Sequence, residues 1–135
     1  MSWENSLVKI STYSVEVLRK RLAAIAERRM GAELRLALLH AEFEAERARA
    51  DEDAEAGWYR IGYADGWRAR REAVEREIKG IEAEEAGARD ALGAAFEELK
   101  KYEQVADGAL RAQRLAAGRR ECADMDELGL RRAAG

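Results

Sequence analysis

The chain of 135 residues is 38% charged, only 7% aromatic and free of proline, a mixture typical of long helices and coiled coils and not of a globule with a thick apolar core. The net charge of −3 is too balanced for a general nucleic-acid binder, and the single cysteine excludes an internal disulfide, as expected for a reducing cytosol. The first residues lack the pattern of a secretion signal, and no stretch approaches the roughly 20 apolar residues of a membrane span.

The first predicted element is a helix over about residues 8–55. Apolar residues recur in it every seven residues, in two sets that lie three residues apart, which is the pattern of a coiled-coil seam. Arg29 is the one interruption before the pattern fails beyond Phe43. The first set is Val15, Leu22, Arg29, Leu36, Phe43 and Ala50, and the second is Leu18, Ile25, Ala32, Leu39, Glu46 and Asp53.

A turn is expected over about residues 56–67, where three glycines within ten residues interrupt the helical pattern. Four of the nine aromatic side chains also gather here. Because tryptophan and tyrosine are favoured anchors at interfaces, one interpretation is a partner-binding knob at the tip of a hairpin. The alternative is that the rings pack on one another and close the turn. The four residues are Trp58, Tyr59, Tyr63 and Trp67.

A second helix is predicted over about residues 68–128, again with two seven-residue sets. This seam is thinner and richer in alanine, and glycines within the helix each cost about 1 kcal/mol relative to alanine. We therefore expect a helix that depends on its partner for stability. The first set is Val74, Ile81, Ala88, Ala95, Tyr102, Ala109 and Ala116, and the second is Ile78, Glu85, Leu92, Leu99, Ala106, Gln113 and Arg120.

Together these elements predict an all-α fold, a single domain over residues 1–135 that forms a long two-helix antiparallel coiled-coil hairpin. With the turn centred near residue 60, facing residues have numbers that add to about 120 or 121, which sets Leu36 opposite Glu85. A shift of one heptad, with the turn near Gly57 or Tyr63, would also satisfy the pattern, whereas a shift of two residues would not. The same heptads would also pair between two chains, so an intermolecular dimer remains an alternative. In the hairpin, some 20–25 C-terminal residues extend beyond the first helix.

Charge is polarised along the chain. Residues 1–30 and 108–135 together are net +5, so the middle of the chain is net −8. In a hairpin both basic segments lie at the same end, where they are suited to an acidic partner or cavity. The alternative is a solubilising coat. A nucleic-acid-binding hairpin is a weaker interpretation, because acidic residues are interspersed and no aromatic residue is interleaved.

Catalysis has little support in this sequence. His40 is the only histidine and lies next to the seam, and Cys122 has neither a second cysteine nor a nearby histidine. No glycine-rich phosphate loop is present. The sequence therefore predicts a protein that is not an enzyme, with no metal, no cofactor and no small-molecule substrate.

Several segments of the chain carry a family resemblance. They are the run Phe96-Glu97-Glu98-Leu99-Lys100-Lys101-Tyr102-Glu103, the short motifs Arg119-Arg120-Glu121 and Asp126-Glu127-Leu128, and the N-terminal positions Leu7, Ile10, Tyr13 and Leu22. In these segments the chain resembles the FliJ family of flagellar export proteins. The resemblance implies a stalk similar to the central stalk of rotary ATP synthases, acting as a soluble component of the bacterial flagellar type III export apparatus. It further implies a cytoplasmic location at the inner membrane of the flagellar base, a role in flagellum biogenesis and motility, and no nucleic-acid partner.

The partners that the resemblance implies are the hexameric export ATPase FliI, its regulator FliH, the export gate protein FlhA and export chaperones. A generic coiled-coil adaptor, or the equivalent stalk of an injectisome, is the alternative. We expect the aromatic tip, with Trp58, Tyr59, Tyr63 and Trp67, to face the gate. We expect the ATPase to contact Leu110, Arg111, Arg114, Leu115, Arg119 and Arg120, supported by Arg19, Arg21 and Arg28.

Overall fold

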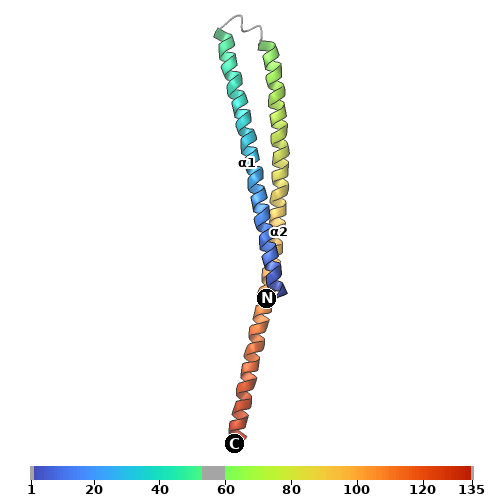
Figure 1. The fold of residues 1–135 in the computed structure, drawn as a ribbon, viewed down its shortest axis with the longest axis vertical. Coiled ribbons are helices and arrows are strands. Elements are labelled where there is room, and N and C mark those ends of the chain that lie inside the picture. The colour runs from blue at the N-terminus through green and yellow to red at the C-terminus, as the bar shows by residue number, and fades with distance from the viewer. Residues whose placement is uncertain (1, 53–59, 135) are drawn as a thin grey trace. The chain divides into compact units, whose positions relative to one another are not determined.

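The computed structural model describes residues 2–52 and 60–134, which form two helices, α1 (Trp3–Glu52) and α2 (Arg60–Ala134) (Figure 1). No strand occurs within these two ranges, so the described chain is all-α as predicted. The absence of proline and the abundance of alanine, glutamate, arginine and leucine explain why the helices run so long. The chain divides into two compact units, residues 17–92 and residues 1–16 with 93–135.

The helix bounds differ from those expected at both ends of α1 and α2. α1 begins at Trp3 and not near residue 8, because Ser2 caps it: the Asn5 amide donates to Ser2 Oγ at 3.3 Å. α2 begins at Arg60, so residues 60–67, expected in the turn, are helical. Packing of Trp67 against α1 outweighs the cost of the nearby glycines, since tertiary contacts usually decide helix stability.

Within residues 17–92, most of the buried and half-buried side chains follow alternating steps of three and four residues on both helices. This confirms the predicted seam. A cluster of Ile25, Ala32, Ile81 and Ala88 forms its centre, and Ala32 is completely enclosed. The seam positions are Leu18, Leu22, Ile25, Arg29, Ala32, Leu36, Leu39, Phe43, Glu46 and Ala50 on α1, and Trp67, Arg71, Val74, Ile78, Ile81, Glu85, Ala88 and Leu92 on α2.

Three interhelical ion pairs define the register of this unit. They join Arg28 to Glu84, Arg35 to Glu77 and Glu42 to Arg70, one pair per heptad along the same side of the seam. The numbers rise along α1 as they fall along α2, so the helices are antiparallel. Each pair adds to 112, one heptad from the register centred on residue 60 and close to the shifted alternative.

The polar residues of the seam explain this choice of register. Arg29 Nε donates to Glu85 Oε2 at 2.7 Å, and the side chain of Glu85 is only 9% exposed. The register centred on residue 60 would instead set Glu85 against Leu36. Arg89 on α2 also pairs with Glu85 at 2.7 Å, and this contact within one helix does not depend on the register. The observed register adds Arg29 as a second cation beside this buried carboxylate, which favours it over the other heptad alignment.

In the other unit, Ser11, Val15 and Ala95 are buried, and Leu99, Tyr102, Ala106 and Ala109 are half-buried. The start of α1 lies beside α2, because Ser2, Glu4 and Asn5 line one depression together with Ala106, Ala109 and Gln113. α2 then continues past the N-terminus of α1 (Figure 1, orange to red). From residue 110 to residue 134 all residues except the half-buried Gly118 are exposed.

Neither helix contains, within the described ranges, a segment that is both long and apolar enough to cross a membrane.

Candidate partner-binding surfaces

Residues 110–134 of α2, called here the C-terminal extension, carry large apolar side chains in contact with solvent. Their exposed fractions range from 46% to 72%. Single exposed apolar residues are ordinary, but five within one helical segment make it a candidate docking surface. They are Leu110, Leu115, Met125, Leu128 and Leu130.

Cations are interleaved with these apolar residues. Arg111, Arg114 and Arg119 are exposed, and Arg120 Nε donates to the Ala116 carbonyl at 3.5 Å within the helix. Arg114, Leu115 and Arg119 line one open depression together with Cys122 and Asp126. The structure therefore places the six C-terminal residues predicted to contact a partner on one exposed helical segment.

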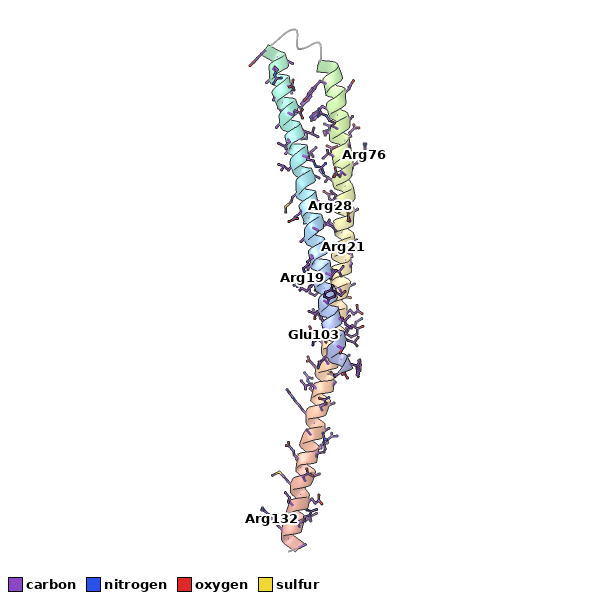
Figure 2. The ribbon with its side chains drawn as sticks, viewed as in Figure 1. Arg19, Arg21, Arg28, Arg76, Glu103 and Arg132 are labelled. Carbon is purple, nitrogen blue, oxygen red and sulfur yellow. The ribbon has the colours of Figure 1, made fainter. Side chains whose placement is uncertain are left out.

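The supporting arginines predicted on α1 belong to the other unit, residues 17–92. Arg19, Arg21 and Arg28 are all exposed along α1 (Figure 2). Arg28 already has a role in the helix pair, because its Nη1 donates to both carboxylate oxygens of Glu84 at 3.0 Å. A partner that used Arg28 would have to compete with this ion pair.

The aromatic end of the helix pair is organised around Trp67, which is only 5% exposed. Its ring stacks on Phe43 with centroids 4.3 Å apart, and its Nε1–H donates to the Leu39 carbonyl at 2.7 Å. The rings of His40 and Trp67 meet edge to face with centroids 5.3 Å apart, and the Arg71 guanidinium lies 5.0 Å from the Trp67 ring centroid. Trp67 therefore fastens α2 to α1, and contact with a partner would require its ring to leave the seam.

Tyr63 is half-buried and lies parallel to Phe43, with ring centroids 6.4 Å apart. Trp58 and Tyr59 lie outside the described residues. The roles of Phe43, His40 and Arg71 around Trp67 escaped the sequence argument. One signal was available, since Trp67 and Arg71 fall one heptad before Val74 and Ile78 and so continue the predicted seam.

Electrostatic effects are concentrated along the helix pair. Arg35 Nη2 donates to Glu77 Oε1 at 2.6 Å, and this bond is the main cause of the lowered pKa of Glu77 and the raised pKa of Arg35. The bond to Glu85, followed by that to Glu33, raises the pKa of Arg29. The Arg35–Glu77 and Arg29–Glu85 bonds join α1 to α2, so they help to hold the helices in register.

Histidine, cysteine and acidic side chains do not gather into groups of three that could hold a metal ion anywhere in residues 2–52 and 60–134. Cys122 is an exposed free thiol on the C-terminal extension, and His40 contacts Trp67. The arrangement therefore offers surfaces for macromolecular contact: a basic and apolar extension, and a helix pair with a closed aromatic end.

Comparison with curated proteins gives the family. Over 134 residues the chain is 54% identical to proteins from two strains of Caulobacter vibrioides, each named flagellar FliJ protein, and the match covers 98% of this chain and 95% of each relative. The chain belongs to the FliJ family. No protein-family model and no solved structure matches it. Because the FliJ alignment covers nearly the whole chain, it spans both the helix pair and the C-terminal extension.

Proposed function

We propose that this FliJ-family chain is a stalk or adaptor of the bacterial flagellar type III export apparatus, at the cytoplasmic face of the inner membrane. Its C-terminal extension binds the hexameric export ATPase FliI and promotes ring assembly and activity. The observation that carries this proposal is the exposed helical segment in which leucines and arginines alternate without a neighbouring helix to cover them. The shared identity with flagellar FliJ proteins supports the flagellar setting.

The extension has the properties that entry into a ring requires. Twenty-five helical residues span about 37 Å at 1.5 Å per residue, so the segment reaches deep into a pore. Arg111, Arg114 and Arg119 complement acidic walls and speed association, while Leu115 and Met125 supply apolar surface that is buried on contact. Arg19, Arg21 and Arg28 add positive charge along α1.

The gate protein FlhA, the regulator FliH and export chaperones are further partners in the same proposal. FlhA is assigned to the aromatic end, with Trp58, Tyr59, Tyr63 and Trp67. For Trp67 and Tyr63, packing against Phe43 supports an indirect part, in which they hold together the helices that present this end. Trp58 and Tyr59 are then the side chains to test for direct contact.

Stimulation of ATP hydrolysis by the purified export ATPase tests the C-terminal role. We expect Arg111→Glu with Arg114→Glu to abolish stimulation at concentrations where the wild-type chain saturates, with helix content and melting unchanged. The matched control is Arg47→Glu with Arg76→Glu, which reverses two exposed charges elsewhere and should stimulate normally. Full stimulation by the first variant would contradict the proposal.

Capture of the FlhA cytoplasmic domain on immobilised chain tests the aromatic end. Trp58→Ala with Tyr59→Ala leaves Trp67 in the seam, so a loss of capture reports on contact and not on loosening of the helix pair. We expect capture to fall at least tenfold while ATPase stimulation is retained. Undiminished capture, together with normal motility of cells carrying the variant, would contradict binding of FlhA at the aromatic end.

A further inference from the structure

A groove runs along one side of the helix pair in the unit of residues 17–92. Its volume is about 460 Å³, and its floor consists of the half-buried seam residues Leu39 and Val74. One bank carries Leu38, which is 60% exposed, and the opposite bank carries the much smaller Ala73. The remaining lining residues are charged: Arg35 and Glu42 on α1, and Arg70 and Glu77 on α2.

Two ion pairs frame this groove. Arg35 Nη2 and Glu77 Oε1 are 2.6 Å apart at one end, and Arg70 Nη1 and Glu42 Oε2 are 3.8 Å apart at the other. Each helix supplies an arginine followed seven residues later by a glutamate. Because the helices are antiparallel, the cation lies on α1 at one end of the groove and on α2 at the other. The frame is therefore nearly two-fold symmetric.

We propose that this groove is the docking site for a second copy of the chain, with a two-fold axis parallel to the helices. In this arrangement α1 of each copy lies over α2 of the other and runs antiparallel to it. Arg35 of one copy then faces Glu77 of the second, and Glu42 faces Arg70. At each end four charges alternate around a square, so every neighbour is of opposite sign, as a self-complementary interface requires.

The sizes of the side chains match the same arrangement. Leu38 of each copy lies over Ala73 of the other, which leaves room for the larger side chain. One heptad further along, Gly31 on α1 and Gly80 on α2 occupy the equivalent positions. A methyl group added at either glycine would meet nothing within 4 Å in the chain itself. The same is true of the other described glycines, so what matters at Gly31 and Gly80 is their place on this side of the helix pair, where the lack of a side chain lets a second backbone approach closely.

A two-fold axis across the helices, which would make the copies run in opposite directions, fits less well. That axis places Leu38 against Leu38 and Ala73 against Ala73, with crowding on one bank and a void on the other. It also brings Arg28 over Arg49, where like charges repel. Outside that one pair the charges do not distinguish the two axes, because this axis also sets Arg35 against Glu42 and Arg70 against Glu77, which are of opposite sign. The sizes of the side chains therefore carry the choice of axis, and this argument does not depend on the proposed export function.

Sedimentation equilibrium tests whether the second copy binds at this groove. We expect the mass to rise with concentration from 15.1 kDa toward twice that value, and to fall back in high salt. Ala73→Arg fills the groove and should keep the chain monomeric at every concentration with unchanged helix content. Ala69→Arg, on an exposed position outside the groove, is the matched control and should dimerise normally. A wild-type chain that stays monomeric, or an Ala73→Arg variant that still dimerises, would overturn the proposal.

Disulfide trapping tests the direction of the two copies. In a Cys122→Ser background, chains with Leu38→Cys and chains with Ala73→Cys are prepared separately, so each carries one thiol and can cross-link only to another copy. After mixing and mild oxidation, we expect a cross-link between the two variants, at least tenfold above that formed by either variant alone. Predominant cross-linking of Leu38→Cys with itself would overturn the assigned axis, and an absence of any cross-link would overturn the groove contact.

Discussion

Replacing Trp67 by alanine should destabilise the helix pair by about 3 kcal/mol. The ring is 5% exposed, so truncation removes nearly all of its burial and leaves a cavity beside Phe43. Loss of the stacked pair and of the Nε1–H bond to Leu39 each account for about 1 kcal/mol of this cost. The total falls at the low end for a buried tryptophan, because a two-helix seam can collapse more readily than a multilayered core.

Trp67→Phe separates these contributions. Phenylalanine keeps a ring against Phe43 but cannot donate a hydrogen bond, and it is smaller than the indole. The Leu39 carbonyl is interior to α1 and keeps its own helical bond, so no acceptor is left unsatisfied. We expect a cost of about 1 kcal/mol, well below that of the alanine variant.

Urea unfolding followed by circular dichroism at 222 nm measures both values. The matched control is Trp3→Ala, because Trp3 is the same residue type but is 64% exposed, and its loss should change the unfolding free energy by less than about 0.5 kcal/mol. A cost below about 1 kcal/mol for Trp67→Ala, or an equal cost at Trp3, would refute the assignment of Trp67 to the seam.

Two further outcomes follow from the helix pair. The bond from Arg35 lowers the pKa of Glu77 in the folded chain, so on acidification the unfolded state takes up protons first. The stability that this pair contributes should be complete above the ordinary pKa of 4.5 and lost as pH falls through the lower pKa of the folded chain. Arg35→Ala should therefore flatten the acid-unfolding curve monitored by circular dichroism, and an unchanged curve would argue against the pair. Gly93→Ala should raise the unfolding free energy by about 1 kcal/mol in a urea titration, because alanine favours the helix more than glycine does. Gly93 is helical and exposed, and an added methyl group meets nothing within 4 Å. A loss of stability would mean that other atoms lie closer to Gly93 than the structure shows.

The seam was predictable from the sequence because a seven-residue repeat is a local property. Ile25, Ala32 and Ile81 fall in the predicted sets and form the core cluster. The register was not decided by the same pattern, since a shift of seven residues leaves every seam position in a seam position. What favours the observed register is the meeting of Arg29 with Glu85, two residues that interrupt their own sets and stabilise one another only when they face each other.

The candidate surfaces were predictable to different degrees. The exposure of Leu115 and Arg114 follows from the predicted lengths of the two helices, because α2 extends beyond the start of α1. The position of Trp67 depended on where the second helix begins. The glycines around Trp67 suggested a turn, but packing of Trp67 against Phe43 stabilises the helix across them. This contact joins residues far apart in sequence, so local helix propensity does not predict it.

The C-terminal extension has one further consequence, for dynamics. Among the described residues, those from 114 to 134 make about six helical turns without an α1 residue beside them, so their helix is held mainly by local hydrogen bonds. Gly118 and Gly129 weaken it further. Backbone amides there should exchange with solvent orders of magnitude faster than those beside Ala32, which open only with the whole pair. A partner that binds the C-terminal extension must therefore supply part of the free energy that holds this segment helical. The cost of ordering the segment lowers the affinity and makes the contact readily reversible.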